Sequence, residues 1–232
     1  LLAFVLFTGG VPPWSWDELG PITATCDALY INFISGFEMD LETAQALRSG
    51  FPGPTYADLH SLFLGVGPNG LRIPRGLPSW EAWLGCFDAV QLNAEEFGLL
   101  GRGVDDPWEL AAQAVGPELK LMTVTLGPEG ARFVTGAGFK SDPLDWSETR
   151  HLAVSPGPAR SGFAPLKGPE AAGDPTGCGD VWGATLLARL LRGDRLQPAM
   201  IEANRIATKN VGHRGVSGLH EHLMDPDPQV HS

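Results

Sequence analysis

One segment of the chain combines small residues, a carboxylate and the start of a helix in a way that suits anion chemistry. It reads Asp174-Pro-Thr-Gly-Cys-Gly-Asp180 and is followed by an apolar run, which predicts a helix over residues 178–192. Glycines at a helix start let backbone N–H groups approach an anion, and the helix dipole adds a favourable potential. Phosphoryl transfer needs such a cradle, and Asp180 beside it could accept a proton from an attacking hydroxyl. The alternative is a glycine-rich loop in which Asp180 only caps the helix.

Two further segments are weaker when each is taken alone. Asn93-Ala-Glu-Glu96 follows the apolar run 87–92, at the expected end of a strand and start of a helix. An Asn N-cap with Glu at the third helical position is also the pattern of a capping box, which needs no ligand. The second segment, Val124-Thr-Leu-Gly-Pro-Glu-Gly130, has the pattern of a strand that enters a hairpin turn.

Together and in this order, the three segments resemble the ribokinase-like (PfkB) carbohydrate kinase family. The family signature D-T-x-G-A-G-D aligns with D-P-T-G-C-G-D at residues 174–180, where Pro175 replaces threonine, Cys178 replaces alanine and the last aspartate is kept. Residues 93–96 match its N-x-x-E motif, and residues 124–130 match its strand-turn segment beside the nucleotide phosphates. The resemblance implies an α/β fold, a three-layer αβα sandwich with a mostly parallel central sheet.

The resemblance also implies an activity and a set of site residues. The activity is transfer of the γ-phosphate of Mg-ATP to a hydroxyl of a sugar or related small molecule. Asp180 would be the general base, and the backbone of Gly177, Cys178 and Gly179 would form the anion cradle. The remaining implied ligands are Thr125, Gly127, Gly130 and Asn204 for the nucleotide, Asn93 and Glu96 for Mg²⁺ through waters, and Asp174 and Thr176 for K⁺. A solvated helix position is the alternative for Asn204, and Pro175 is the departure that bears on the K⁺ site.

Other segments carry less chemistry. Tyr56-Ala-Asp58-Leu-His60 looks like the D-x-N-x-R position of the family with His60 in place of Asn, so His60 lies near the phosphate path or is a loop histidine without a role. Residues 65–70 match G-x-G-x-x-G, but the prolines that follow exclude a helix, and we expect a loop. There is no P-loop motif. His220 and His222 have no third metal ligand nearby, which favours a solvated turn.

The elements that must position these residues alternate between strand-like and helix-like runs, which favours a parallel α/β sheet. We expect one domain over residues 1–224 and a frayed tail over 225–232. Residues 136–173 are expected to be mostly loop. The expected strands are 1–7, 27–34, 54–58, 87–92, 119–126 and 131–135, and the expected helices are 40–48, 93–100, one that begins at 106, 178–192 and 198–210.

Composition limits the partners. The 232 residues include 27 acidic and 16 basic ones, a net charge of −11, which disfavours non-specific binding to nucleic acid or to an anionic membrane. No apolar run approaches the roughly 20 residues that a transmembrane helix needs. Three distant cysteines, with no C-x-x-C, predict neither a disulfide framework nor a zinc site, and they suit a reducing compartment such as the cytoplasm.

The resemblance covers only the later part of the family fold. Members begin with a strand, a glycine pair that binds the sugar and lid strands, whereas Gly9-Gly10 here stands in a different context. We therefore expect the N-terminal strands and the lid to be truncated. This leaves the acceptor open among sugars, sugar acids and nucleosides, and it leaves a nucleotide-binding module or inactive pseudokinase fragment as the alternative. Homodimers in this family pair through the lid, so a homodimer is expected only of the full-length protein.

Overall fold

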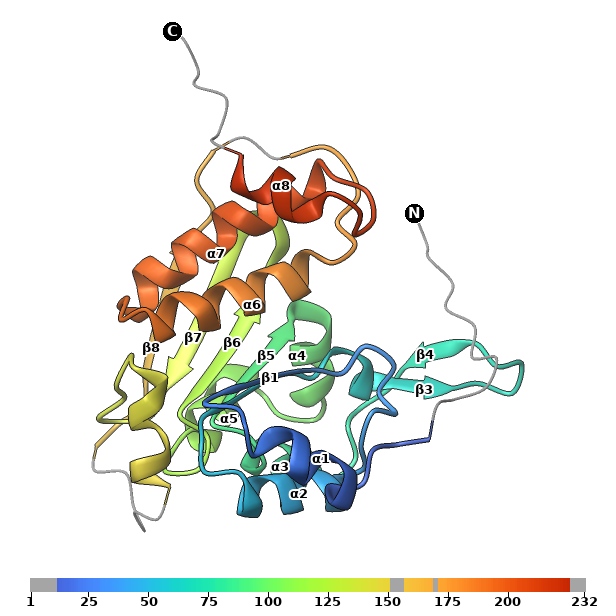
Figure 1. Cartoon of the computed structure of the whole chain (residues 1–232), viewed down its shortest axis with the longest axis vertical. Helices are drawn as coiled ribbons and strands as arrows, with labels where there is room; N and C mark the ends of the chain where they lie inside the picture. The colour runs from blue at the N-terminus through green and yellow to red at the C-terminus, as the bar shows by residue number, and fades with distance from the viewer. Residues whose placement is uncertain (1–11, 151–156, 169–170, 226–232) are drawn as a thin grey trace, which may run out of the picture.

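A six-stranded sheet in the order β1-β2-β5-β6-β7-β8 forms the centre of the computed structural model, which describes residues 12–150, 157–168 and 171–225 (Figure 1). Its strands are β1 (Leu29–Asn32), β2 (Thr55–Asp58), β5 (Ala89–Asn93), β6 (Leu121–Thr125), β7 (Gly130–Thr135) and β8 (Arg160–Pro165). The first four are parallel, and β7 and β8 are antiparallel to their neighbours. The carboxyl ends of the four parallel strands therefore meet at one edge of the sheet.

Helices cover both faces of this sheet. On one face α6 (Cys178–Leu191) and α7 (Leu196–Val211) run side by side (Figure 1). The other face carries α2 (Leu41–Gly50), α3 (Trp80–Gly85), α4 (Ala94–Leu100) and α5 (Pro107–Ala114). In addition, α1 (Trp16–Thr23) packs on α2, and α8 (Leu219–Met224) packs on α7. The expected three-layer αβα sandwich with a mostly parallel sheet is confirmed.

Alternation along the strands divides the core into two layers. Tyr56 of β2 packs in the cluster under α6 and α7, whereas its neighbour Ala57 packs in the cluster on the other face. Successive strand residues point to opposite faces, so Asp58 lies on the same face as Tyr56. The same parity puts Gln91 of β5 on the α6 face. This alternation decides which polar side chains can reach the start of α6.

Local sequence explains several helix starts. The carboxylate of Asp40 accepts a bond from the amide of Thr43 at 2.8 Å, and that of Asp106 accepts one from the amide of Trp108 at 2.8 Å. Pro107 at the first helical position of α5 needs no acceptor for an N–H. These side chains satisfy amides that the first helical turn leaves free, which is why the predicted starts at residues 40 and 106 are confirmed.

Several elements differ from the sequence-based expectation. The prediction of a loop over residues 136–173 is wrong at 160–165, because β8 pairs with β7 there. The expected loop at residues 65–70 is wrong at 65–66, which belong to the short strand β3 (Leu64–Val66). Residues 67–71 connect it to β4 (Arg72–Pro74), and this hairpin extends to the right in Figure 1. Helices α1, α3 and α8 were not predicted. The expected strand at residues 1–7 and most of the expected tail lie outside the described residues.

A buried ion network ties the strands together at the edge away from α6's first turn. Asp88, just before β5, is fully buried and binds Arg48 at 2.7 Å and Arg150. It also accepts bonds from the amide and hydroxyl of Thr55 at 2.9 and 3.1 Å. These partners hold the pKa of Asp88 below its ordinary value despite its burial. Within the part of the chain that the structure describes, no helix is both long and apolar enough to cross a membrane.

Candidate active site

The site is built around the first turn of α6. Gly177 is the N-cap residue with φ 80°, a left-handed conformation that glycine adopts without strain. The amides of Gly179 and Asp180 lie in the first helical turn, where no intrahelical acceptor is available to them. Asp180 is the third helical residue, is exposed, and its Oδ1 accepts a 2.6 Å bond from Nδ2 of Asn32. Because Gly177 caps the helix and no side-chain cap bond forms, Asp180 is not a capping residue.

A row of polar side chains crosses the sheet beneath this turn. Asn32 of β1 is in register with Asp58 of β2, Asp58 with Gln91 of β5, and Gln91 with Thr123 of β6. Nε2 of Gln91 donates to Oδ2 of Asp58 at 2.8 Å and to the carbonyl oxygen of Gly179 at 3.0 Å. The sheet is therefore hydrogen-bonded directly to the first turn of α6.

Asp58 is a second carboxylate below Asp180, and it is only 5% exposed. Its pKa is raised to about 7, first by burial and then by the negative charges of Glu96 and Asp180, against the opposing effect of the amide and ring of His60. Near neutral pH Asp58 therefore exchanges its proton readily. The hydroxyl of Tyr30 lies close to both carboxylates, is buried, and has no hydrogen-bond partner among the described residues.

The predicted magnesium residues form a hydrogen-bonded chain that ends at His60. The side chain of Asn93 accepts from the amide of Glu96 at 3.0 Å, and the Glu96 carboxylate accepts from the amide of Asn93 at 2.8 Å. This is a capping box, as its sequence pattern allows. The same carboxylate binds Nδ1 of His60, which raises the pKa of His60 above its ordinary value. His60 is not an isolated loop histidine, and its side chain is 54% exposed, so its outer nitrogen faces the open side of the site.

A pocket of about 420 Å³ adjoins the cradle on the side of α7. It brings together all four residues predicted for the nucleotide with two residues of the cradle, and it is closed by apolar side chains. The predicted residues in its wall are Thr125, Gly127, Gly130, Asn204, Cys178 and Gly179. The hairpin between β6 and β7 supplies the first three of these. A Cβ at Gly130, where φ is 116°, would lie 2.3 Å from the carbonyl oxygen of Ala164, so only glycine fits at this turn.

Asn204 is buried in the wall of this pocket rather than solvated. Its Oδ1 accepts from the indole Nε1 of Trp182 at 2.7 Å, and its Nδ2 donates to the carbonyl oxygen of Ala164 at 2.9 Å. The amide therefore joins α7 to α6 and β8. Its direct contact with a base stays a prediction.

The residues predicted for K⁺ lie on the loop before the cradle. Oδ1 of Asp174 accepts from the amide of Thr176 at 3.0 Å, and the carbonyl oxygen of Thr176 accepts from Nδ2 of Asn210 at 2.9 Å. The K⁺ site stays a prediction. Across residues 12–150, 157–168 and 171–225, no three His, Cys, Asp or Glu side chains lie where they could share a metal ion.

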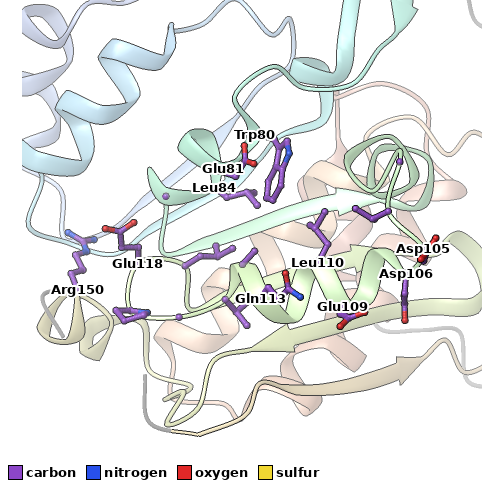
Figure 2. Close-up of a pocket in the computed structure, with 18 residues that line it drawn as sticks. Trp80, Glu81, Leu84, Asp105, Asp106, Glu109, Leu110, Gln113, Glu118 and Arg150 are labelled. Atoms are coloured by element: carbon purple, nitrogen blue, oxygen red, sulfur yellow. The ribbon is translucent and has the colours of Figure 1, made fainter. Parts of the chain in front are cut away.

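A larger hollow of about 1120 Å³ lies elsewhere, between α3 and α5. Figure 2 shows Trp80 and Leu110 near its middle, Asp106 at one end, and Glu118 and Arg150 at the other. Arg150 is already bound to Asp88. None of the predicted site residues lines this hollow, and it lies on the face of the sheet opposite α6. We place the candidate site at the cradle instead.

Sequence reasoning missed two residues that contact the site, Asn32 and Gln91. Asn32 is separated from Asp180 by 148 positions, and Gln91 is separated from Gly179 by 88. The only local signal was a polar residue inside each of two apolar strands. Asp58 was recognised as a strand end, but its link to Gln91 depends on the register of β2 and β5.

Comparison with solved structures shows a ribokinase-like fold. A pyrophosphate-dependent kinase in the ribokinase family, solved as a sulfate complex, matches with a TM-score of 0.65 and 16% identity over 94% of this chain and 69% of that chain. Ribokinase from Thermotoga maritima matches with a TM-score of 0.54 and 18% identity, over 90% of this chain and 58% of that chain. Nucleoside kinase from Burkholderia thailandensis, in complex with inosine, matches with a TM-score of 0.57 and 16% identity, over 86% and 54%.

These identities establish the fold alone. No protein-family model matches the chain, and no curated protein matches its sequence. The chain spans 54% and 58% of the lengths of the nucleoside kinase and the ribokinase.

Proposed function

We propose that this chain is a kinase that transfers the γ-phosphate of Mg-ATP to a hydroxyl of a sugar or related small molecule. The observation that carries the proposal is the position of Asp180. It is an exposed carboxylate oriented by Asn32, and it lies in the same helical turn as the amides of Gly179 and Asp180, which have no intrahelical acceptor. A carboxylate in this position can accept the proton of an attacking hydroxyl, while the amides and helix dipole stabilise the charge on the phosphoryl group.

The adjoining pocket supports a nucleotide as the donor. Its far wall is made of apolar residues, which include Leu166, Ala207 and Val211, and its near wall is the cradle. A planar base fits an apolar pocket, while its phosphates would lie at the start of α6. The nucleoside kinase and the ribokinase with this fold are consistent with such a donor.

Pyrophosphate is a second candidate donor. Pyrophosphate-dependent kinases are among the proteins that share this fold. A diphosphate would need the cradle but not the apolar pocket. The presence of that pocket is why we favour ATP.

The donor set beside the cradle fits Mg²⁺. Carboxylate and amide oxygens are the ligands that Mg²⁺ prefers, and it keeps much of its water in such sites. Both oxygens of Glu96 already accept hydrogen bonds from Asn93, so Asn93 and Glu96 would hold the ion through waters. When bound, Mg²⁺ would neutralise charge on the donor phosphates. K⁺ binding by Asp174 and Thr176, a cytoplasmic location and a homodimer of the full-length protein remain parts of the proposal.

The test is ADP release from Mg-ATP by the purified chain with sugars, sugar acids and nucleosides as acceptors. We expect acceptor-dependent ADP release that falls roughly 10²–10⁴-fold in Asp180→Asn, since the variant lacks the base. Asp27→Asn is the matched control because Asp27 is exposed and lies outside the site. Full turnover in Asp180→Asn would contradict the role of Asp180.

A parallel assay separates the donors. Pyrophosphate replaces ATP, and release of inorganic phosphate is measured. Thr208→Phe would fill the pocket beside Asn204 without touching the cradle. It should therefore weaken the binding of ATP and leave the binding of pyrophosphate unchanged. ATP binding without turnover on any acceptor would support the alternative, a nucleotide-binding module or inactive pseudokinase.

A further inference from the structure

We propose that Gln91 is a positioning residue for Asp180: its amide fastens the first turn of α6 to the carboxylate of Asp58 and so fixes the direction in which Asp180 points. The inference rests on the proposed function, because it assigns to Gln91 a role in the reaction of that same site. Gln91 itself does not reach the open side of the site, as it is only 2% exposed.

Both the nitrogen and the oxygen of the Gln91 amide form hydrogen bonds. Its nitrogen donates to Asp58 at 2.8 Å and to the carbonyl oxygen of Gly179 at 3.0 Å, and its oxygen accepts from the hydroxyl of Tyr56 at 3.2 Å. Tyr56 is in turn 3.1 Å from the hydroxyl of Thr123. The orientation of the amide is therefore set by partners on β2 and in the first turn of α6, and it cannot rotate without the loss of a bond.

Gly179 is the residue next to Asp180, so a bond to its carbonyl controls the height and rotation of the turn that carries the carboxylate. The carboxylate of Asp180 has a second restraint at its other end, from Nδ2 of Asn32 at 2.6 Å. One restraint acts on the backbone and the other on the side chain. Of these two restraints, only the bond from Asn32 would remain if Gln91 were replaced.

The space around the amide is closed on the side of α6. A Cβ at Gly183, one turn after Gly179, would lie 2.4 Å from Oε1 of Gln91 and 2.5 Å from the hydroxyl of Tyr30. The helix thus approaches the sheet closely where these polar side chains lie. A purely apolar contact would suffice to pack α6, as it does further along the helix at Leu186 and Leu190. A buried glutamine whose polar atoms are all hydrogen-bonded indicates that this position orients the helix, and does not only fill the core.

The test combines Gln91→Leu with Asp180→Asn in a double-mutant cycle. In otherwise unchanged protein we expect Gln91→Leu to lower kcat about 10- to 100-fold, because small misplacement of a reacting group has effects of this size. KM for the donor should change less than kcat does, since the pocket is formed by other residues. In the Asp180→Asn background Gln91→Leu should have no further effect, because the group it positions is gone.

Gln91→Met guards against a variant that fails to fold. Methionine keeps the length and approximate volume of glutamine but has no N–H to donate to Asp58 and Gly179, and it should show the same loss of kcat. Thr135→Val is the matched control: Thr135 is a buried polar residue of the same sheet, on β7 and paired with the start of β6, away from the cradle. It should change stability without a selective effect on kcat. An equal fold-loss from Gln91→Leu with and without Asp180 would overturn the proposal, as would unchanged kcat in both Gln91 variants.

A second measurement does not need turnover. Amide hydrogen exchange of Val181, which bonds the carbonyl of Gly177 in the first turn of α6, should become at least about tenfold faster in Gln91→Leu and stay unchanged in Thr135→Val. Unchanged exchange in Gln91→Leu would refute the positioning role even if the chain proved inactive. If the parent protein showed no turnover but exchange of Val181 were faster in Gln91→Leu, the result would count against the proposed function. It would not count against the bond by which Gln91 restrains the first turn of α6.

Discussion

Replacing Asp58 by asparagine should remove part of the pH dependence of the free energy of unfolding. In the folded protein the pKa of Asp58 is raised from 3.8 to about 7, mainly by burial. Between these pH values the folded state keeps a proton that the unfolded chain has released, so the free energy of unfolding falls as the pH rises. Each pKa unit corresponds to about 1.36 kcal/mol, which gives a total loss of about 4 kcal/mol across the whole window. From about pH 5 to about pH 8 the expected loss is about 2.5 kcal/mol.

Asparagine does not titrate, so Asp58→Asn should lack this loss. The assay is urea unfolding of both proteins at about pH 5 and about pH 8. At each pH, the free energy of unfolding of the parent protein is subtracted from that of the variant. That difference should shift by about 2.5 kcal/mol in favour of the variant at the higher pH, or roughly 5–10 °C in Tm for a chain of this size. The raised pKa of His60 also removes stability as the pH rises through it, but the main cause of that rise, the hydrogen bond to Glu96, is present in both proteins. A difference that stays constant within about 0.5 kcal/mol would refute the reasoning.

Three other predictions concern packing and buried polar contacts. Gly183→Ala should lower the free energy of unfolding by about 1–3 kcal/mol, because the added Cβ would meet Gln91. Gly98→Ala in α4 is the comparison: a Cβ there has nothing within 4 Å, so the same urea assay should show a rise of up to about 1 kcal/mol. Asp88→Asn should cost about 3–5 kcal/mol, because two buried arginines lose their counter-charge, and an unchanged melting temperature would contradict this. Asn204→Leu leaves a buried indole N–H unsatisfied and should weaken ATP binding measured by calorimetry more than it weakens pyrophosphate binding.

Three helix starts could be predicted from the sequence alone. The caps at Asp40, Asn93 and Asp106 each bond an amide two or three residues further along the chain, so the sequence pattern contains the whole interaction. The start of α6 was predictable for the same reason, since Gly177 is its N-cap residue and Asp180 lies in its first turn.

Features that depend on distant partners were not predictable. Residues 160–165 contain glycine and proline and become β8 only because β7 presents an edge to them. Gln91 looked like one polar exception in an apolar strand, and its role depends on the register with Asp58 and on the placement of α6. The pKa of Asp58 likewise follows from burial, which no local pattern specifies.

The bond between Asn32 and Asp180 also bears on how the protein folds. It closes a segment of 148 positions, which is most of the chain. Closure of so long a loop has an entropic cost that is offset only once the intervening strands have paired, and contacts of this range slow folding. Asp180 therefore gains its orienting partner late, after β2, β5 and β6 have assembled between the two residues. If Asp180 is the base that we propose, a partly folded chain would hold it without its orienting partner, and activity would be acquired only at the end of folding.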